Sequence, residues 1–82
     1  MNETQFEFTV ASDTEFDELI ADIGFGTNLV ALLTQEKGFE NLRIRIYPPK
    51  EGEYWNFRLD EFENVLQKAK QRLWELRKTT NE

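Results

Sequence analysis

The sequence predicts an α+β domain, with a mainly antiparallel meander sheet, a short N-terminal helix and a long C-terminal helix packed on one face. Several runs alternate between apolar and polar residues, as half-buried strands do. The C-terminal part instead repeats its apolar residues at helical spacing. The chain has 82 residues, which suits one domain, so we assign residues 1–82 to it and expect a frayed tail over 79–82.

The first two elements are predicted by a change from strand period to helix period. Residues 5–10 alternate, with an apolar face formed by Phe6, Phe8 and Val10. Residues 12–15 read Ser-Asp-Thr-Glu, a capping box in which the side chains of Ser12 and Glu15 satisfy each other's backbone amides. A short helix should start here, because apolar residues follow at helical spacing at Phe16, Leu19, Ile20 and Ile23.

The end of this helix has two interpretations. The helix continues to Ile23, or it ends near Leu19 and residues 20–25 form a strand. In the second case residues 26–28, Gly-Thr-Asn, turn the chain into a further strand over 29–33. We favour the short helix followed by this hairpin, because Gly and Asn tolerate the positive φ of tight turns.

Two more strands are expected on either side of a proline turn. After a loop over 36–41, residues 42–47 alternate, with apolar residues at Leu42, Ile44 and Ile46. Residues 47–54, YPPKEGEY, predict a turn. Residues 54–59 then alternate again, with apolar residues at Trp55, Phe57 and Leu59.

The C-terminal helix has the clearest pattern. Asp60 and Glu63 match an N-cap and its N3 partner, and acidic residues lead the helix while basic residues close it near Arg77. The apolar stripe consists of Phe62, Val65, Leu66, Ala69, Leu73 and Leu76. We expect the helix to cover one face of the sheet, with Phe62, Leu66, Leu73 and Trp55 in one core.

The composition excludes much catalytic chemistry. The chain has no cysteine and no histidine, which removes disulfides, thiolate nucleophiles, His-based catalysis and metal sites built on these ligands. Residues 13–17 resemble half of a calcium loop, but its sixth and twelfth positions hold Glu18 and Gly24 instead of Gly and Glu. The Gly-Phe-Gly of residues 24–26 lacks the third glycine of a phosphate loop. We expect no enzymatic activity, no cofactor and no metal.

Charge is divided unevenly along the chain. The formal net charge is −6, and residues 1–40 hold nine acidic residues against Lys37 alone. This acidic segment is either ordinary solvated surface or a face that steers the protein toward a basic partner. It argues against a nucleic-acid partner. Its candidate partner-binding residues are Glu15, Asp17, Glu18 and Asp22.

A second candidate surface depends on strands 42–47 and 54–59 being neighbours. Their polar residues would then share the sheet face away from the helix, namely Arg43, Arg45, Tyr54, Asn56 and Arg58. These side chains either form salt bridges with Asp22, Glu7 or Glu36, or they bind a protein. RNA binding on such a face is the third interpretation, but the glycine-aromatic motif for it is absent.

Trp74 is the last candidate. It lies beside the apolar stripe of the C-terminal helix, between Lys70 and Lys78. It either covers the edge of the sheet or contacts a partner.

The N-terminus predicts a cytoplasmic location. Residues 1–10 have neither the basic region nor the apolar region of a signal peptide, and no apolar run in the chain approaches 18 residues. We therefore expect no membrane partner.

The stretch from Ala21 to Leu73 resembles small uncharacterised bacterial proteins of immunity type. Three pieces carry the resemblance: ADIGFGTNLVALLTQEKG, LRIRIYPP and YWNFRLDEFENVLQKAKQRL. The resemblance implies a non-enzymatic inhibitor of a toxin or nuclease, and it assigns no functional residues. Our hypothesis is therefore a small acidic protein-binding domain that neutralises a basic partner. The alternative is a self-associating structural module, a homodimer formed through the open sheet face or an edge strand.

Overall fold

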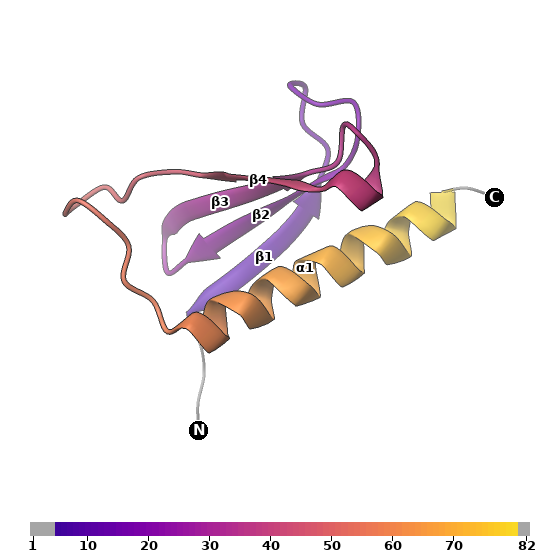
Figure 1. Cartoon of the computed structure of the whole chain (residues 1–82). Helices are drawn as coiled ribbons and strands as arrows, with labels where there is room; N and C mark the ends of the chain where they lie inside the picture. The colour runs from indigo at the N-terminus through magenta and orange to yellow at the C-terminus, as the bar shows by residue number, and fades with distance from the viewer. Residues whose placement is uncertain (1–4, 81–82) are drawn as a thin grey trace.

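The computed structural model describes residues 5–80 as a two-layer α+β fold (Figure 1). One layer is a four-stranded sheet in the order β1-β2-β3-β4, with each strand antiparallel to the next. The other is one long helix. The elements are β1 (Phe6–Ala11), β2 (Ile20–Phe25), β3 (Asn28–Thr34), the 3₁₀ turn η1 (Phe39–Asn41), β4 (Arg43–Ile46) and α1 (Leu59–Thr80). The predicted antiparallel meander with a long C-terminal helix is confirmed.

Helix α1 covers one face of the sheet and packs mainly on β1 and β2. Its inner face places Val65, Ala69 and Leu73 in the core. The sheet contributes the other buried residues of this core, which are Phe6, Ala21, Ile23, Val30, Ala31 and Leu33. Phe62, Leu66 and Trp55 are partly buried against it, as expected. Within the described residues, no helix is long and apolar enough to cross a membrane.

The hairpin between β2 and β3 is the one the sequence predicts. Gly26 opens its two-residue turn with φ of 63°, a value that a side chain would strain. One irregularity follows the turn, because Ile23 pairs with Ala31 whereas Gly24 pairs with Leu29. Val30 is therefore the extra residue of a β-bulge, and both Val30 and Ala31 are buried in the core.

The predicted N-terminal helix is wrong, because residues 12–19 form a loop. The Asp13 side chain accepts the amide of Glu15 at 2.8 Å, and its carbonyl accepts the amide of Phe16 at 3.0 Å. These bonds replace those of the expected capping box with a single turn. Ile20 and Ile23 had suggested helical spacing, but they lie on opposite faces of β2 and both are buried.

The predicted strand over 54–59 is also wrong. The chain leaves the sheet after β4, where Pro48 and Pro49 have no amide hydrogen to donate, and it runs unpaired to α1. Trp55 and Phe57 are partly buried without strand pairing, whereas Leu59, the third apolar residue of the run, is exposed. Phe57 packs against Phe6, with ring centroids 4.7 Å apart, and Trp55 donates its Nε1 hydrogen to the carbonyl of Tyr47 at 2.7 Å.

The start of α1 differs slightly from the expected one. The helix begins at Leu59, so Asp60 lies in its first turn and is not its N-cap. Arg58 donates two hydrogen bonds to the Asp60 carboxylate, at 3.1 and 2.7 Å. This contact holds the pKa of Asp60 below its ordinary value. The helix continues to Thr80, and residues 81–82 of the expected frayed tail lie outside the described residues.

Candidate functional site

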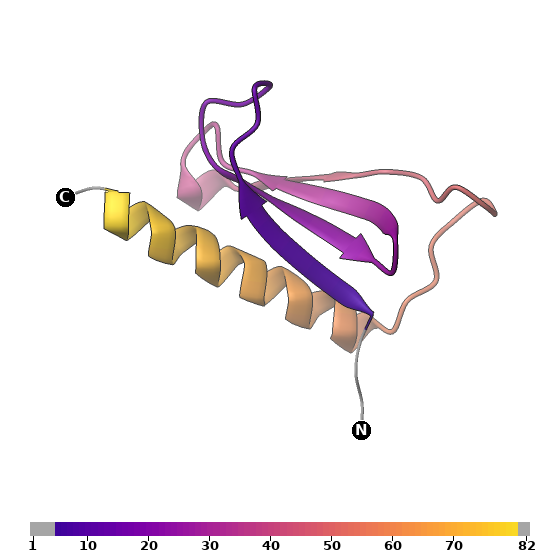
Figure 2. The same ribbon diagram turned by 180° about the vertical axis from the view of Figure 1, so that it is seen from behind.

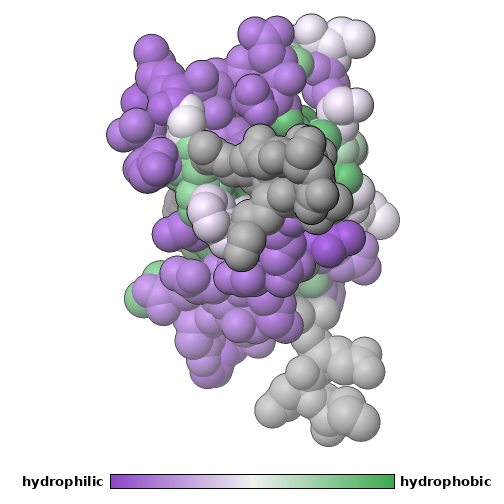
Figure 3. Space-filling model, turned by 90° about the vertical axis from the view of Figure 1, so that its right-hand side faces the viewer, coloured by the Kyte–Doolittle hydropathy of each residue, from purple (hydrophilic) through white to green (hydrophobic). Residues whose placement is uncertain are grey.

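Four exposed carboxylates lie on two loops at one end of the sheet, the loop over 12–19 and the loop that follows β3, and Glu36 joins these loops. We call this group the acidic tip, and it consists of Asp13, Asp17, Glu18 and Glu36. The loop over 12–19 rises on the side of the sheet opposite α1 (Figures 1 and 2). Figure 3 views this end of the molecule, and hydrophilic residues predominate in its upper part, with smaller pale and hydrophobic areas among them.

The acidic tip is held in place by Glu36. Its two carboxylate oxygens accept the backbone amides of Asp17 at 3.1 Å and of Glu18 at 2.8 Å. The side chains of Asp17 and Glu18 therefore remain directed to solvent while their backbone is fixed. No ion pair reaches the four carboxylates from any residue between 5 and 80 whose side chain is described.

Glu15 belongs to the same loop but is already paired. Its Oε2 accepts a hydrogen bond from the Arg45 guanidinium on β4 at 2.9 Å. The Arg45 guanidinium also lies over the Phe16 ring, 5.3 Å from its centroid, and donates to the Tyr47 hydroxyl at 3.4 Å. The contacts with Glu15 and Tyr47 raise the pKa of Arg45 further. The predicted salt bridge on this arginine exists, with Glu15 as the partner instead of Asp22, Glu7 or Glu36.

Asp22 lies on the sheet face away from α1, which we call the far face. It is in register with Thr9 on one side and Leu32 on the other, and Leu32 is in register with Arg45. Partial burial raises the pKa of the Asp22 carboxyl, and the nearby charge of Asp13 raises it further. Ile20 and Leu32 are buried although they lie on this face, so the loop over 12–19 covers part of it.

The predicted cluster of arginines on the far face does not form. Arg43 and Arg45 both project from β4 on this face, because they are in register with Thr34 and Leu32. Arg58 instead lies at the start of α1, paired with Asp60 and Glu61. Tyr54 is 74% exposed in the unpaired segment before α1. Asn56 is exposed in the same segment, so it does not share the face either.

The β4 edge carries exposed apolar side chains, Ile44 and Ile46. Ile44 is 42% exposed and Ile46 is 57% exposed. Both lie on the α1 side of the sheet, because Ile44 is in register with Leu33 and Ile46 with Ala31. They remain uncovered because α1 packs on β1 and β2.

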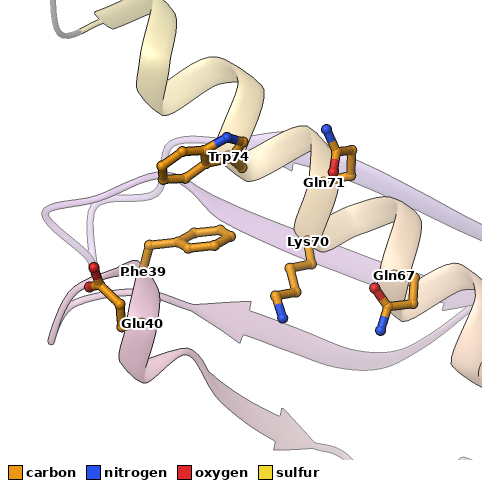
Figure 4. Close-up of a pocket in the computed structure, with 6 residues that line it drawn as sticks. All are labelled: Phe39, Glu40, Gln67, Lys70, Gln71 and Trp74. Carbon is orange, nitrogen blue, oxygen red and sulfur yellow. The ribbon is translucent and has the colours of Figure 1, made fainter.

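A groove runs between β4 and α1, and Trp74 closes one end of it (Figure 4). The Trp74 ring lies 5.1 Å from the Phe39 ring of η1 and is 39% exposed. The groove has two hollows of about 510 and 250 Å³ that share Gln67 and Lys70. The apolar side chains that line the two hollows include Phe39, Leu42, Ile44, Leu66 and Trp74.

Sequence reasoning missed the roles of Glu36 and of the β4 edge. Glu36 accepts amides from residues 18 and 19 positions earlier in the chain, and no local pattern signals such a contact. The exposure of Ile44 and Ile46 follows from the placement of α1, although the position of β4 at the end of a meander was a usable signal.

Among residues with a described placement, no group of three or more Asp, Glu, His or Cys side chains is arranged to hold a metal ion. Comparison of the chain with protein-family models, curated proteins and solved structures found no match.

Proposed function

We propose that the protein is a non-enzymatic, cytoplasmic binding domain that neutralises a basic partner, such as a toxin or nuclease, through its acidic tip. The observation that carries the proposal is a fixed group of exposed carboxylates without ion pairs among the described residues. Lys37 is the only base in the two loops that form the tip. An anionic patch of this kind attracts a cationic surface over several ångströms and orients it before contact.

The hydrogen bonds from the backbone to Glu36 support the proposal. A loop that is ordered before binding loses less conformational entropy when a partner docks. The bonds also space the Asp17 and Glu18 side chains, which are adjacent in the chain, on a fixed backbone. Glu15 contributes less charge to the tip than the sequence suggests, because Arg45 neutralises it.

The test is a double charge reversal, Asp17→Lys with Glu18→Lys. Only the backbone amides of these residues make hydrogen bonds, so the reversal should leave the loop intact. The matched control is Glu51→Lys with Glu53→Lys, which makes the same charge change in an exposed segment after β4. Partners are captured from the native host and identified by mass, and their association rates are then measured at several salt concentrations.

We expect the capture to yield a basic protein. It should associate with the wild type and with the control at similar rates, and at least tenfold more slowly with the reversed variant. The association rate should fall as salt rises, because screening shortens the reach of the tip to about 8 Å at 0.15 M salt. Equal association of all three proteins at low salt would contradict the proposed role of the tip. Circular dichroism on each variant checks that the fold is retained.

A second candidate function is self-association, and the β4 edge favours it. This edge combines an unpaired side of the sheet with exposed Ile44 and Ile46. Monomeric proteins usually protect such edges with charges, bulges or a covering segment, and the charges of β4, Arg43 and Arg45, lie on the far face and leave Ile44 and Ile46 uncovered.

A further inference from the structure

The outer side of β4 offers backbone groups for pairing. The amide of Tyr47 donates to the carbonyl of Val30 on β3 at 2.8 Å. In an antiparallel pair, backbone groups of alternate residues point to the same side, so those of Arg43 and Arg45 also point toward β3. The amide and carbonyl groups of Ile44 and Ile46 therefore point outward, and β4 is the last strand of the sheet.

The side chains of β4 fall into an apolar row and a charged row. Ile44 and Ile46 face the α1 side, where Leu42 continues the row and is partly buried against the core. Arg43 and Arg45 face the far side. Any strand that pairs with β4 must present apolar groups to one row and compensate the positive charge of the other.

We propose that β4 pairs antiparallel with β4 of a second copy of the chain, around a two-fold axis through Ile44. This inference rests on self-association, the second candidate function, and names its surface. In this register Ile44 lies opposite Ile44 of the second copy, and Ile46 lies opposite its Leu42. The apolar row thus matches itself along its whole length, and the two sheets join into one.

The charged rows of the two copies also meet, and their like charges need a compensating carboxylate. Arg43 lies opposite Arg45 of the second copy, whose guanidinium is held by Glu15 through Oε2 alone. Glu15 Oε1 accepts no hydrogen bond within the described part of the chain, and Arg43 makes no ion pair there. Glu15 of each copy can therefore bind two arginines, its own Arg45 and Arg43 of the other copy.

The alternative register, centred on Arg45, fits less well. It places the two Arg45 guanidinium groups directly opposite each other, which is unfavourable for like charges. It also sets Leu42 opposite Pro48 of the second copy, which has no amide hydrogen to donate. The register centred on Ile44 also opposes arginines, Arg43 against Arg45, but it leaves one Glu15 carboxylate beside each such pair and sets no proline opposite a paired residue.

The register is tested by cysteine cross-linking, because the chain has no cysteine of its own. In a hydrogen-bonded antiparallel pair the opposed Cα atoms lie about 5.5 Å apart. That separation falls within the disulfide range of about 4.4–6.8 Å. The single variant Ile44→Cys should therefore form a disulfide-linked dimer under mild oxidation.

Two matched variants serve as controls. In Ile46→Cys the two thiols would be separated by four residues along the strand, or about 14 Å. In Leu59→Cys the thiol lies on α1, at a residue that is 69% exposed. Its cross-linking rate measures disulfide formation by random collision of two molecules. We expect cross-linking of Ile44→Cys to be at least tenfold faster than that of either control. Equal rates for the three variants would overturn the proposed interface.

Sedimentation equilibrium of the wild type separates failure of this interface from failure of self-association. We expect a species of about twice 9.8 kDa at micromolar concentration. Ile44→Lys should weaken the dimer at least tenfold, because two ammonium groups would meet at the axis, while Leu29→Lys, at a comparably exposed residue, should not. A dimer that Ile44→Lys leaves intact would overturn the β4 interface alone, and a wild-type monomer at high concentration would overturn self-association as well.

Discussion

Leu73 and Leu66 lie on the same stripe of α1, but they differ in burial. Leu73 is fully buried, whereas Leu66 is partly exposed at the groove beside β4. Truncating a buried leucine removes its transfer free energy and leaves a cavity. We expect Leu73→Ala to lower the free energy of unfolding by about 2–5 kcal/mol. Leu66→Ala should cost less, and urea denaturation of the two variants compares them. A larger loss at Leu66 would mean that α1 is rotated from the described position.

Asp22 should give the protein a pH-dependent stability. Its carboxyl has a raised pKa in the folded state, because partial burial and then the charge of Asp13 disfavour ionisation. Between the unfolded and folded pKa values, the native state binds more protons than the unfolded chain. This carboxyl therefore makes stability fall as the pH rises through that range, and the loss persists above it.

The variant Asp22→Asn tests this sign. It removes the charge, and Asp22 makes no hydrogen bond through its side chain within the described residues. We expect the variant to unfold at a higher temperature than the wild type at pH 7. The difference should vanish below the ordinary aspartate pKa of about 3.9. Melting curves across this range make the comparison, and a variant that is less stable at pH 7 would contradict it.

At the scale of single residues, the sequence predicted which residues belong to the candidate site better than it predicted which residues they contact. It singled out Glu15 and Arg45 as site residues, yet it did not pair them, because they are 30 positions apart in the chain. Arg58 was expected beside Arg45, but that expectation depended on a strand that does not form. Contacts between distant positions depend on register and loop path, which no local pattern encodes.

The turn between β2 and β3 depends on Gly26. Its φ of 63° lies in the left-handed region, and an added Cβ would lie 3.4 Å from the side-chain oxygen of Gln5. An L-residue in this conformation costs about 1–2 kcal/mol. We expect Gly26→Ala to destabilise the protein by that amount in urea denaturation. Gly24→Ala is the control, since Gly24 has no positive φ, and an equal loss there would contradict the argument.

The loop over 12–19 depends on Glu36 for its order. Replacing the side chain in Glu36→Ala removes the acceptor for the amides of Asp17 and Glu18. We expect hydrogen exchange at these two amides to accelerate by roughly tenfold, because a net hydrogen bond contributes about 0.5–1.5 kcal/mol. Amides of β2 and β3 should be unaffected. Glu36→Gln keeps one acceptor oxygen and should show an intermediate rate, and unchanged rates in both variants would exclude the described contact.

Among the elements, those with one dominant period were predicted correctly. Strand β1 and α1 each show a regular apolar pattern, whereas the β2–β3 hairpin was favoured by its Gly-Thr-Asn turn. The loop over 12–19 was taken for a helix because Ile20 and Ile23 have the spacing of one helix face. In the structure they belong to a strand, β2, and are buried on its two opposite faces. The segment before α1 was misread because Trp55 and Phe57, at alternate positions, pack against the core while their backbone stays unpaired.

The molecule as a whole relies on α1 to close its core. Helix α1 supplies Val65, Ala69 and Leu73, opposite an apolar sheet face that no other helix covers within residues 5–80. We expect a chain truncated after Arg58 to lose cooperative unfolding, because the face under α1 would be open to water. Far-UV circular dichroism during heating measures this. A cooperative transition in the truncated chain would show that the sheet is stable without the helix.

The strand order has a consequence for how fast the chain folds. Each strand pairs with the next strand along the chain, so every pairing in the sheet closes only the loop between two consecutive strands. The docking of α1 on β1 is the step that joins opposite ends of the sequence. Short closures lose little chain entropy, and folding rates rise as the mean sequence separation of contacts falls. We therefore expect the sheet to form from local encounters and the chain to fold quickly for its β content, with the docking of α1 as the contact of greatest sequence separation.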